Sequence, residues 1–516
     1  PAWDTSVKVM QTWFQQFILL TPIQLLALIP ALVCGALAYS SKRKSNDDNE
    51  ESPQILSRPL QVAGVGERFF EIAQRHQTLI TAYWLTLASA KPISEGLVRQ
   101  ALEHLYRKVP PLRKCLRLID GLLWECEMTT ENIDFMLMED ANPKQVFEQL
   151  LSESFNSELG PLWRARLIPS EAGSCPIPEL QEKYPHNYNL LLSNHHGIAD
   201  GTSNIKMCNL LNQILNDLVA GHTINDEEQL GEHVDETQGL QILNTIRKKL
   251  SENPERVKFL LDDEGIEVPP LIIIAYPPKG EKHPHTKCIP HEMDKETTQK
   301  LLKRCKQEGA TLHSLFTAAI DGTLVDMALE AGVHENEYRL TINHFVNLRR
   351  YYQGDTSHIL GCHVCVQKQN TMTPNKWREC IWNLAREIKQ DLHSKLDNQG
   401  PLEAEVIRQM LMPNDEKAML NIFEKPLPHT RDYQISNMGD LTRMFSGEGE
   451  HIQVVRQVRA TTIQHYLEPQ SHFLHTFRGK LMYCLNYDSN YLSEDVMVKL
   501  VNKLFITLKQ IAEGEI

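Results

Sequence analysis

The stretch Leu190-Leu-Leu-Ser-Asn-His195-His196-Gly-Ile-Ala-Asp200-Gly201 carries more information than any other part of this sequence. Its apolar start is typical of a buried strand, and this strand runs directly into two histidines. A neutral imidazole can take a proton from an alcohol, a thiol or an amine near neutral pH. The pair therefore indicates a general base held at a strand end. The alternative is a buried histidine pair that closes the strand and does no chemistry.

The residues after the histidines predict how the loop is held. A carboxylate at Asp200 is expected to pair with a cation and fix the loop rather than to act as a second base. Gly201 is expected to allow a sharp exit from the loop. Residues 202–218 change from polar to apolar, which favours a helix capped by Thr202 or Ser203.

The spacing His-His-x-x-x-Asp-Gly resembles the motif of the coenzyme-A-dependent acyltransferase superfamily. This group includes chloramphenicol acetyltransferase, the condensation domains of peptide synthetases and the alcohol acetyltransferases. Further segments resemble the family in the same order along the chain, and they are residues 58–60, 101–113, 155–167, 308–320, 346–349, 436–439 and 485–488. The chain is nearest the alcohol acetyltransferase and condensation branches, because it has no Asp-Phe-Gly-Trp-Gly segment of the plant BAHD type.

The resemblance implies an α/β fold. Two chloramphenicol-acetyltransferase-like subdomains, each a two-layer α/β sandwich, would face each other across a central tunnel with the motif at its middle. A chain of 516 residues is long enough for two such halves and an appendage. The expected division is an anchor at 1–45, a linker at 46–57, a first subdomain at 58–275, a proline-rich crossover at 276–292 and a second subdomain at 293–516.

The resemblance also implies an activity. His196 would deprotonate an alcohol, which attacks the thioester of acyl-CoA directly, so that acyl-CoA is a co-substrate and no cofactor is bound permanently. His195 would be packed under the loop. Asp200 and Gly201 would shape the motif, and Asp200 would pair with Arg349. The alternative for Arg349 is a solvated position beside Tyr351 and Tyr352. Ser436 or Asn437 would donate to the oxyanion or line the tunnel.

Two other functions fit the same residues. The first keeps the base but forms an amide, or takes its donor from a carrier protein. The second is an inactive binding or scaffold protein with the same fold. The intact His196, Asp200 and Gly201 argue against the scaffold.

The net charge and the cysteines limit which partners and which cellular compartment are expected. The net charge of −13 argues against a nucleic-acid partner, whose phosphates would be repelled. Eleven scattered cysteines indicate a reducing compartment. Cys362 and Cys365 form a single CxxC in a predicted strand, and no second pair completes a zinc site. We expect no metal site, and we expect a monomer.

Two regions are predicted to be solvated. The first is the proline-rich connection, which contains His283, His285, Cys288 and His291. These side chains could gather around a metal ion, but a solvated loop is expected instead. The second is a strand at 453–464, in which Arg456 and Arg459 are expected to be solvated charges.

The N-terminal region predicts a membrane anchor. Residues 17–39 are almost wholly apolar, and about 23 helical residues span roughly 34 Å, enough for a bilayer. Trp13 and Tyr39 lie where interfacial aromatics are expected, and Lys42-Arg43-Lys44 predicts that the following domain is cytoplasmic, most simply on the endoplasmic reticulum. A cleaved signal peptide is the alternative. The chain has no Asn-x-Ser/Thr glycosylation site, which favours the anchor.

Overall fold

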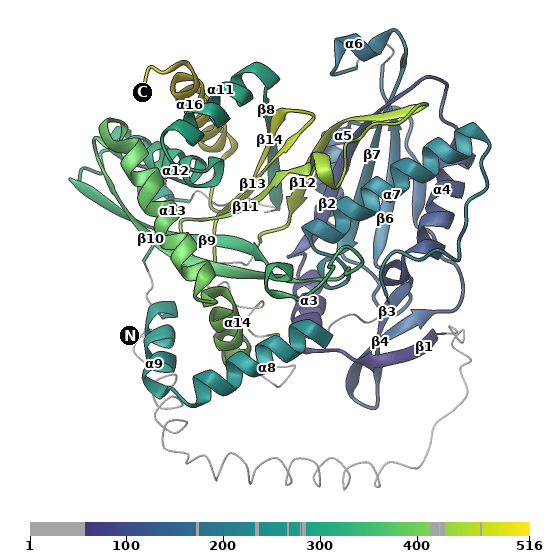
Figure 1. The fold of residues 1–516 in the computed structure, drawn as a ribbon, viewed down its shortest axis with the longest axis horizontal. Coiled ribbons are helices and arrows are strands. Elements are labelled where there is room, and N and C mark those ends of the chain that lie inside the picture. Colours follow the sequence, from purple (N-terminus) through teal and green to yellow (C-terminus); the bar gives the residue numbers. More distant parts are fainter. Residues whose placement is uncertain are drawn as a thin grey trace, which may run out of the picture. The chain divides into compact units, whose positions relative to one another are not determined.

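Two large β-sheets, each covered by helices, organise the chain in the computed structural model (Figure 1). The structure describes residues 57–171, 175–232, 237–265, 268–278, 280, 285–412, 420, 423, 429–464 and 467–516. The predicted anchor and nearly all of the predicted linker lie outside these residues. No helix within the described residues is both long enough and apolar enough to cross a membrane.

The first sheet has five strands and carries the motif on its central strand. In sheet order its strands are β12 (Ile452–Thr461), β2 (Ile80–Ser89), β7 (His186–His195), β6 (Trp163–Pro169) and β5 (Phe135–Leu137). Helices α4 (Glu95–Lys108) and α7 (Gly201–Ala220) share a core with one face, and α5 (Pro143–Ser152) packs on the other. Cover on both faces explains why Leu190 and Leu191 are fully buried.

Local sequence explains the helix positions. In α4, Val98, Ala101, Leu102 and Leu105 form one buried stripe with the spacing of an amphipathic helix. The Ser94 hydroxyl begins this helix by accepting from the Leu97 amide.

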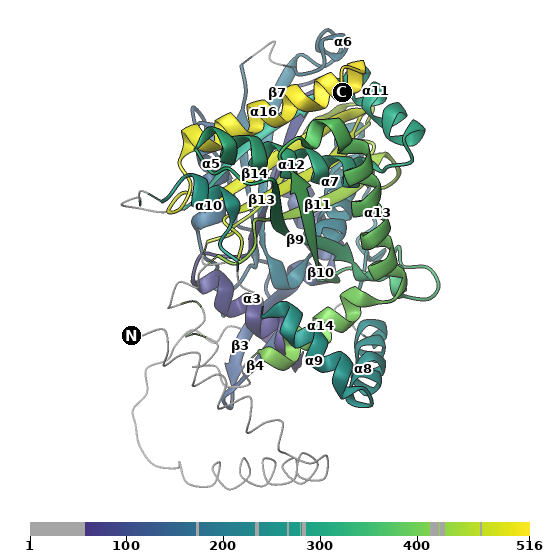
Figure 2. The ribbon, with the colours of Figure 1, turned by 90° about the vertical axis from the view of Figure 1, so that its left-hand side faces the viewer.

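The second sheet has six strands. In sheet order they are β10 (Val364–Pro374), β9 (Glu337–Asn347), β11 (Tyr433–Asp440), β13 (Gln470–Phe477), β14 (Lys480–Asp488) and β8 (Thr286–Met293). The helices that share its core are α10 (Leu271–Ala275), α11 (Lys295–Gln307), α12 (Leu312–Glu330), α13 (Ile381–Asp397) and α16 (Glu494–Glu513). Figure 2 shows α12, α13 and α16 stacked over the strands on this side. In α11, Leu301 and Cys305 are buried on the face that meets the sheet, whereas Leu302 is exposed.

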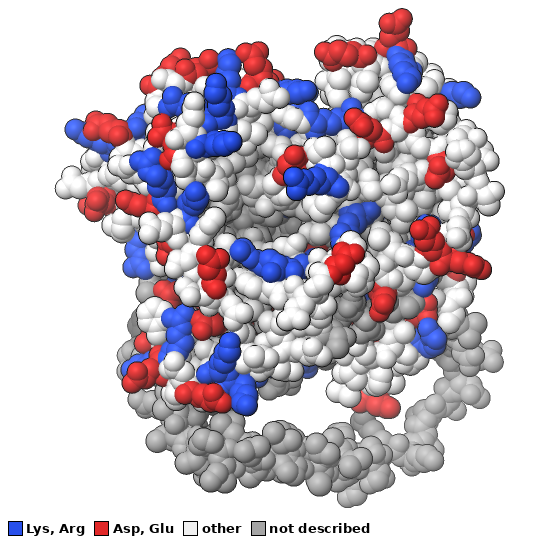
Figure 3. Space-filling model, in the orientation of Figure 1, with Lys and Arg blue, Asp and Glu red and all other residues white. Residues whose placement is uncertain are grey.

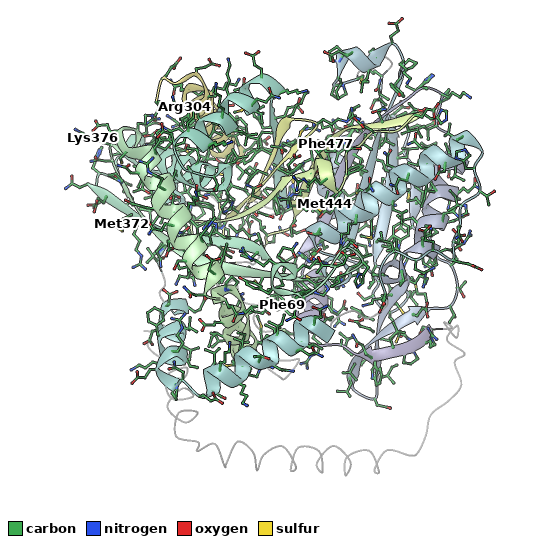
Figure 4. The ribbon with its side chains drawn as sticks, viewed as in Figure 1. Phe69, Arg304, Met372, Lys376, Met444 and Phe477 are labelled. Carbon is green, nitrogen blue, oxygen red and sulfur yellow. The ribbon has the colours of Figure 1, made fainter. Side chains whose placement is uncertain are left out.

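The opposite faces of the two sheets meet in a shared apolar cluster. Phe473, Cys484 and Cys288 from the second sheet pack there with Ala82 and Leu191 from the first. At the end of β13, Phe477 enters the core of the first sheet beside Phe445 and Met444 (Figure 4). The sheets therefore pack on each other directly.

Chain order and sheet membership differ at two strands. β12 comes from the predicted second subdomain, yet it pairs antiparallel with β2 of the first sheet. β8 lies almost wholly inside the predicted crossover and forms the edge of the second sheet beside β14. The prediction of a solvated connection is wrong for Cys288, which is 1% exposed on β8, and His291 packs against the Phe505 ring. His283 lies outside the described residues.

A third, smaller sheet and several outer helices complete the described chain. The sheet consists of β1 (Ser57–Val62), β4 (Leu122–Met128) and β3 (Lys114–Ile119), and β1 contains the family-like segment at 58–60. The outer helices are α3 (Val65–Arg75), α6 (Pro178–Gln181), α8 (Thr237–Ser251), α9 (Pro254–Glu264) and α14 (Gly400–Leu411). On the face drawn in Figure 3, basic and acidic side chains are interspersed rather than gathered by sign.

Candidate active site

His195 is buried at the end of β7 and is held from both ring nitrogens. Its Nδ1 accepts a hydrogen bond of 3.0 Å from the Gly197 amide, and its Nε2 lies 3.3 Å from the Glu71 carboxylate on α3. An accepting Nδ1 places the proton of the neutral ring on Nε2, facing that carboxylate. The structure therefore places His195 beneath the loop, as predicted.

Glu71 is the anchor for this histidine, and sequence reasoning missed it. Its carboxylate accepts from the Ser157 hydroxyl at 2.6 Å and from Arg75 Nε at 2.8 Å. Burial alone would raise the pKa of Glu71, but the His195 ring, Ser157 and Arg75 lower it below its usual value. The residue stays ionised and can orient His195.

His196 faces a different environment from its neighbour. Its ring stacks on Phe70 of α3, with centroids 4.8 Å apart and planes 10° from parallel. Phe69, labelled in Figure 4, packs against Phe70 edge-on and supports it. The Cys362 sulfur lies 3.4 Å from His196 Nδ1. Burial lowers the pKa of His196 below its usual value, so the ring is neutral at pH 7 and can accept a proton.

Asp200 and Arg349 form the predicted ion pair, which is confirmed. Arg349 Nη1 lies 2.5 Å from Asp200 Oδ2, and both side chains are about 95% buried. Arg349 also donates from Nε to the Ile359 carbonyl and from Nη2 to the Ser203 hydroxyl. Burial raises the pKa of Asp200, but the Arg349 charge overcomes this and lowers it below its usual value. The pair joins the end of β9 to the start of α7.

Two expectations about the motif loop are wrong. Asp200 itself caps α7, because its Oδ1 accepts from the Ser203 amide at 2.8 Å, so neither Thr202 nor Ser203 is the cap. The positive N-terminal end of the helix dipole also stabilises the negative charge of this capping carboxylate. Gly201 is the first residue of α7 and does not have a positive φ. A Cβ there would lie 3.0 Å from Met438 Sδ of β11, so glycine gives this side chain room to approach closely.

Ser436 and Asn437 lie on β11, the strand that approaches Gly201. Ser436 Oγ accepts from Arg459 Nη1 at 2.9 Å, which leaves its own hydroxyl proton to donate. Asn437 Oδ1 accepts from the Gly439 amide, which leaves its amino group as the donor. The prediction that Arg459 is solvated is wrong, since it is 4% exposed. Burial lowers the pKa of Arg459 to about 10, so it remains charged at neutral pH.

Arg456 of β12 is only partly buried, unlike Arg459. Its guanidinium lies over the Trp84 ring and 3.5 Å from Glu292. The two arginines differ because residues three apart on a strand point to opposite faces.

Comparison with known proteins identifies the fold. No protein-family model matches the sequence, and no curated protein matches it. Among solved structures, trichothecene 15-O-acetyltransferase from Fusarium sporotrichioides is similar with a TM-score of 0.61 at 13% identity, over 88% of this chain and 95% of that one. Polyketide synthase associated protein 5 from Mycobacterium tuberculosis is similar with a TM-score of 0.59 at 14% identity, over 89% of this chain and 99% of that one.

A condensation domain shows the same likeness. The starter condensation domain of rhizomide synthetase, in complex with C8-CoA, has a TM-score of 0.58 at 14% identity, over 89% of this chain and 95% of that one. The chain has the chloramphenicol-acetyltransferase-like condensation-domain fold. The two α/β subdomains and the resemblance predicted from the motif are thereby confirmed.

A cavity of about 1220 Å³ opens between the sheets, away from the histidines. Trp84 and Asn189 line it from the first sheet, and Pro290 and Glu292 line it from β8. Neither His195 nor His196 lines it, so it is not the predicted tunnel at the motif. Within the described residues, no group of three or more His, Cys, Asp or Glu side chains is placed to hold a metal ion.

Proposed function

We propose that this protein is an acyltransferase that moves an acyl group from acyl-CoA to an alcohol, with His196 as the general base. The observation that carries the proposal is the environment of His196. Its ring is neutral, stacked on Phe70 and bordered by Cys362 at Nδ1, in the loop between β7 and α7. The fold likeness to an O-acetyltransferase and to a condensation domain bound to C8-CoA supports this chemistry.

The proposed reaction is a direct transfer. His196 Nε2 takes the proton of the acceptor hydroxyl as its oxygen attacks the thioester carbonyl. The tetrahedral oxyanion then collapses, the carbon–sulfur bond breaks, and His196 returns the proton to the CoA thiolate. General-base catalysis of this kind contributes about 10²–10⁴-fold. No covalent acyl-enzyme is needed.

Ser436 and Asn437 are the proposed oxyanion donors. Both keep a donor hydrogen that no bond among the described residues uses, and both lie on the strand that touches Gly201. Arg459 beneath Ser436 adds a fixed positive charge close to that hydroxyl, which favours negative charge developing nearby.

An amine acceptor is the second candidate. The chemistry at His196 is unchanged, because an amine nucleophile also loses a proton as it attacks. The likeness to condensation domains, one of them bound to C8-CoA, supports an amine acceptor as the second candidate.

The decisive experiment is an activity screen. The purified full chain would be mixed with acyl-CoAs of several lengths and with pooled alcohols and pooled amines, and free CoA would be measured. Alcohol-dependent release that His196→Ala abolishes supports O-acyl transfer, and release with amines alone supports the second candidate. No release with any pair contradicts both and leaves a donor bound to a carrier protein, or the binding or scaffold role.

We further propose that residues 1–45 anchor the enzyme in a membrane, most simply the endoplasmic reticulum, with the catalytic part cytoplasmic. The support is the uncharged run at 17–39 and the basic cluster at Lys42. The full chain should stay in the pellet after carbonate extraction. Protease should digest the catalytic part on sealed microsomes, and protection would contradict the orientation.

A further inference from the structure

The Asp200–Arg349 pair does not bond to the His196 ring, although both belong to one loop. Asp200 Oδ1 accepts from the Ser203 amide, and Oδ2 accepts from Arg349 and from the His363 amide at 3.0 Å. Both oxygens are thus occupied by groups other than the base. Any control that the pair has over His196 must pass through a neighbouring segment.

That segment is Gly361-Cys362-His363, which precedes β10. The Gly361 carbonyl accepts from the Asp200 amide at 3.0 Å and from the Ser203 hydroxyl at 2.9 Å. On the other side, the His363 amide donates to Asp200, and its ring bonds to the Tyr352 hydroxyl at 2.9 Å. Cys362 therefore lies between two residues that the ion-pair network holds.

Gly361 lets the segment take this path. Its φ is +115°, a region that side chains strongly disfavour, and a Cβ there would lie 3.2 Å from the His363 ring. The backbone at this point is shaped to present Cys362.

The Cys362 thiol is held against one edge of the base. Its sulfur lies 3.4 Å from His196 Nδ1, while Phe70 covers the ring face. A thiol is a weak hydrogen-bonding group. A ring proton on Nδ1 can face this weakly accepting sulfur, and a proton on Nδ1 leaves the lone pair on Nε2.

We propose that Cys362 is a positioning residue for His196, which transmits the Asp200–Arg349 clamp to the ring and keeps water from its Nδ1 edge. The inference rests on the proposed role of His196 as the base. A nucleophilic role for this thiol is disfavoured. Burial and the negative charges of Asp200 and Glu67 raise the pKa of Cys362 well above its usual value, and the thiol is not the reactive form.

The test compares three variants of the full chain. Cys362→Ala opens the Nδ1 edge to water, Cys362→Val keeps it apolar, and Cys365→Ala is the matched control. Cys365 belongs to the same CxxC and is 3% exposed, but its sulfur contacts the Val346 carbonyl 3.8 Å away instead of the motif. Two readouts are used, the pH profile of kcat/KM and the pH-dependent modification of His196 by diethyl pyrocarbonate, localised by mass spectrometry.

We expect Cys362→Ala to lower kcat/KM roughly tenfold or more, since a misplaced catalytic group can cost about 10²-fold. The acidic limb of the kcat/KM profile of Cys362→Ala should move to higher pH, because water stabilises the imidazolium form of His196. Cys362→Val should restore the limb, and Cys365→Ala should leave both readouts unchanged.

The proposal is overturned if Cys362→Ala moves neither readout, or if Cys362→Val shifts both as far as Cys362→Ala. The modification readout needs no substrate. A wild-type chain that releases no CoA therefore defeats the proposed function, while the shift in His196 modification still tests the positioning role.

Discussion

His195 and His196 are neighbours in the chain, yet the structure gives them opposite surroundings. Successive residues at the end of a strand point to opposite sides. His195 turns into the core, where Gly197 and Glu71 occupy both of its nitrogens. His196 turns to the side where Phe70 stacks on its ring and Cys362 lies at its Nδ1. The same side chain is thus structural in one position and suited to chemistry in the next.

The largest expected effect is on the His196 side. His196→Ala should lower kcat/KM by about 10² or more, because a general base contributes about 10²–10⁴-fold. The melting temperature should change little, since the ring makes few polar contacts with the protein. Acyl transfer and thermal unfolding would be measured together. A variant that keeps more than roughly a tenth of the wild-type rate would contradict the assignment of the base.

The ion pair that holds the His196 loop should show the largest effect on stability. Asp200→Asn or Arg349→Met leaves one buried charge without its partner, which costs roughly 3–5 kcal/mol. Both variants should also lose activity, because the 361–363 segment loses its anchor.

A double mutant sharpens this prediction. Asp200→Asn with Arg349→Met should be less destabilised than the sum of the two single variants, because neither charge then lacks a partner. Denaturant unfolding would measure all three free energies. Strict additivity would mean that the two side chains do not act as a pair in solution.

The His195 side should respond in stability more than in rate. His195→Ala leaves the buried Glu71 carboxylate without its ring partner, which costs about 1–3 kcal/mol. The loss of kcat/KM should be smaller than for His196→Ala. Glu71→Gln is the matched variant, because it keeps the size of the side chain and removes the charge. Equal rate losses in the two histidine variants would mean that His195 and His196 do not differ in role.

The smallest expected effect is a shift in pH dependence. The pKa of His196 is lowered by burial, so the base stays deprotonated to a lower pH than an exposed histidine. The acidic limb of kcat/KM should therefore fall below about 6.5, the usual value. Activity lost already above that pH would contradict the desolvated environment.

Local patterns predicted much of the fold and part of the site. The apolar run before His195, the polar-to-apolar run after the motif and the ordered family segments predicted a strand, a helix and the fold correctly. The Asp200–Arg349 pair also followed from the resemblance. These features are local or carried by short motifs, so they can be recognised in the sequence without knowledge of the tertiary structure.

Pairing between distant segments decided the rest. β12 crosses from the second half of the chain to pair with β2, and β8 converts a proline-rich connection into an edge strand. Neither pairing leaves a sequence signal, because any apolar strand can satisfy the hydrogen-bonding groups of either sheet. For the same reason Arg459 looked solvated on its strand but is buried beneath Ser436.

The sequence by itself predicted which residues are suited to chemistry and determined that they lie at a strand end, since side-chain type and hydrophobic spacing are local properties. Only the tertiary structure decided what each residue faces. Glu71 beneath His195, Phe70 and Cys362 around His196, and Met438 against Gly201 come from α3, from the segment before β10 and from β11, far away in sequence. Burial and partner charge set the pKa of a histidine, and both depend on which distant segments pack around it.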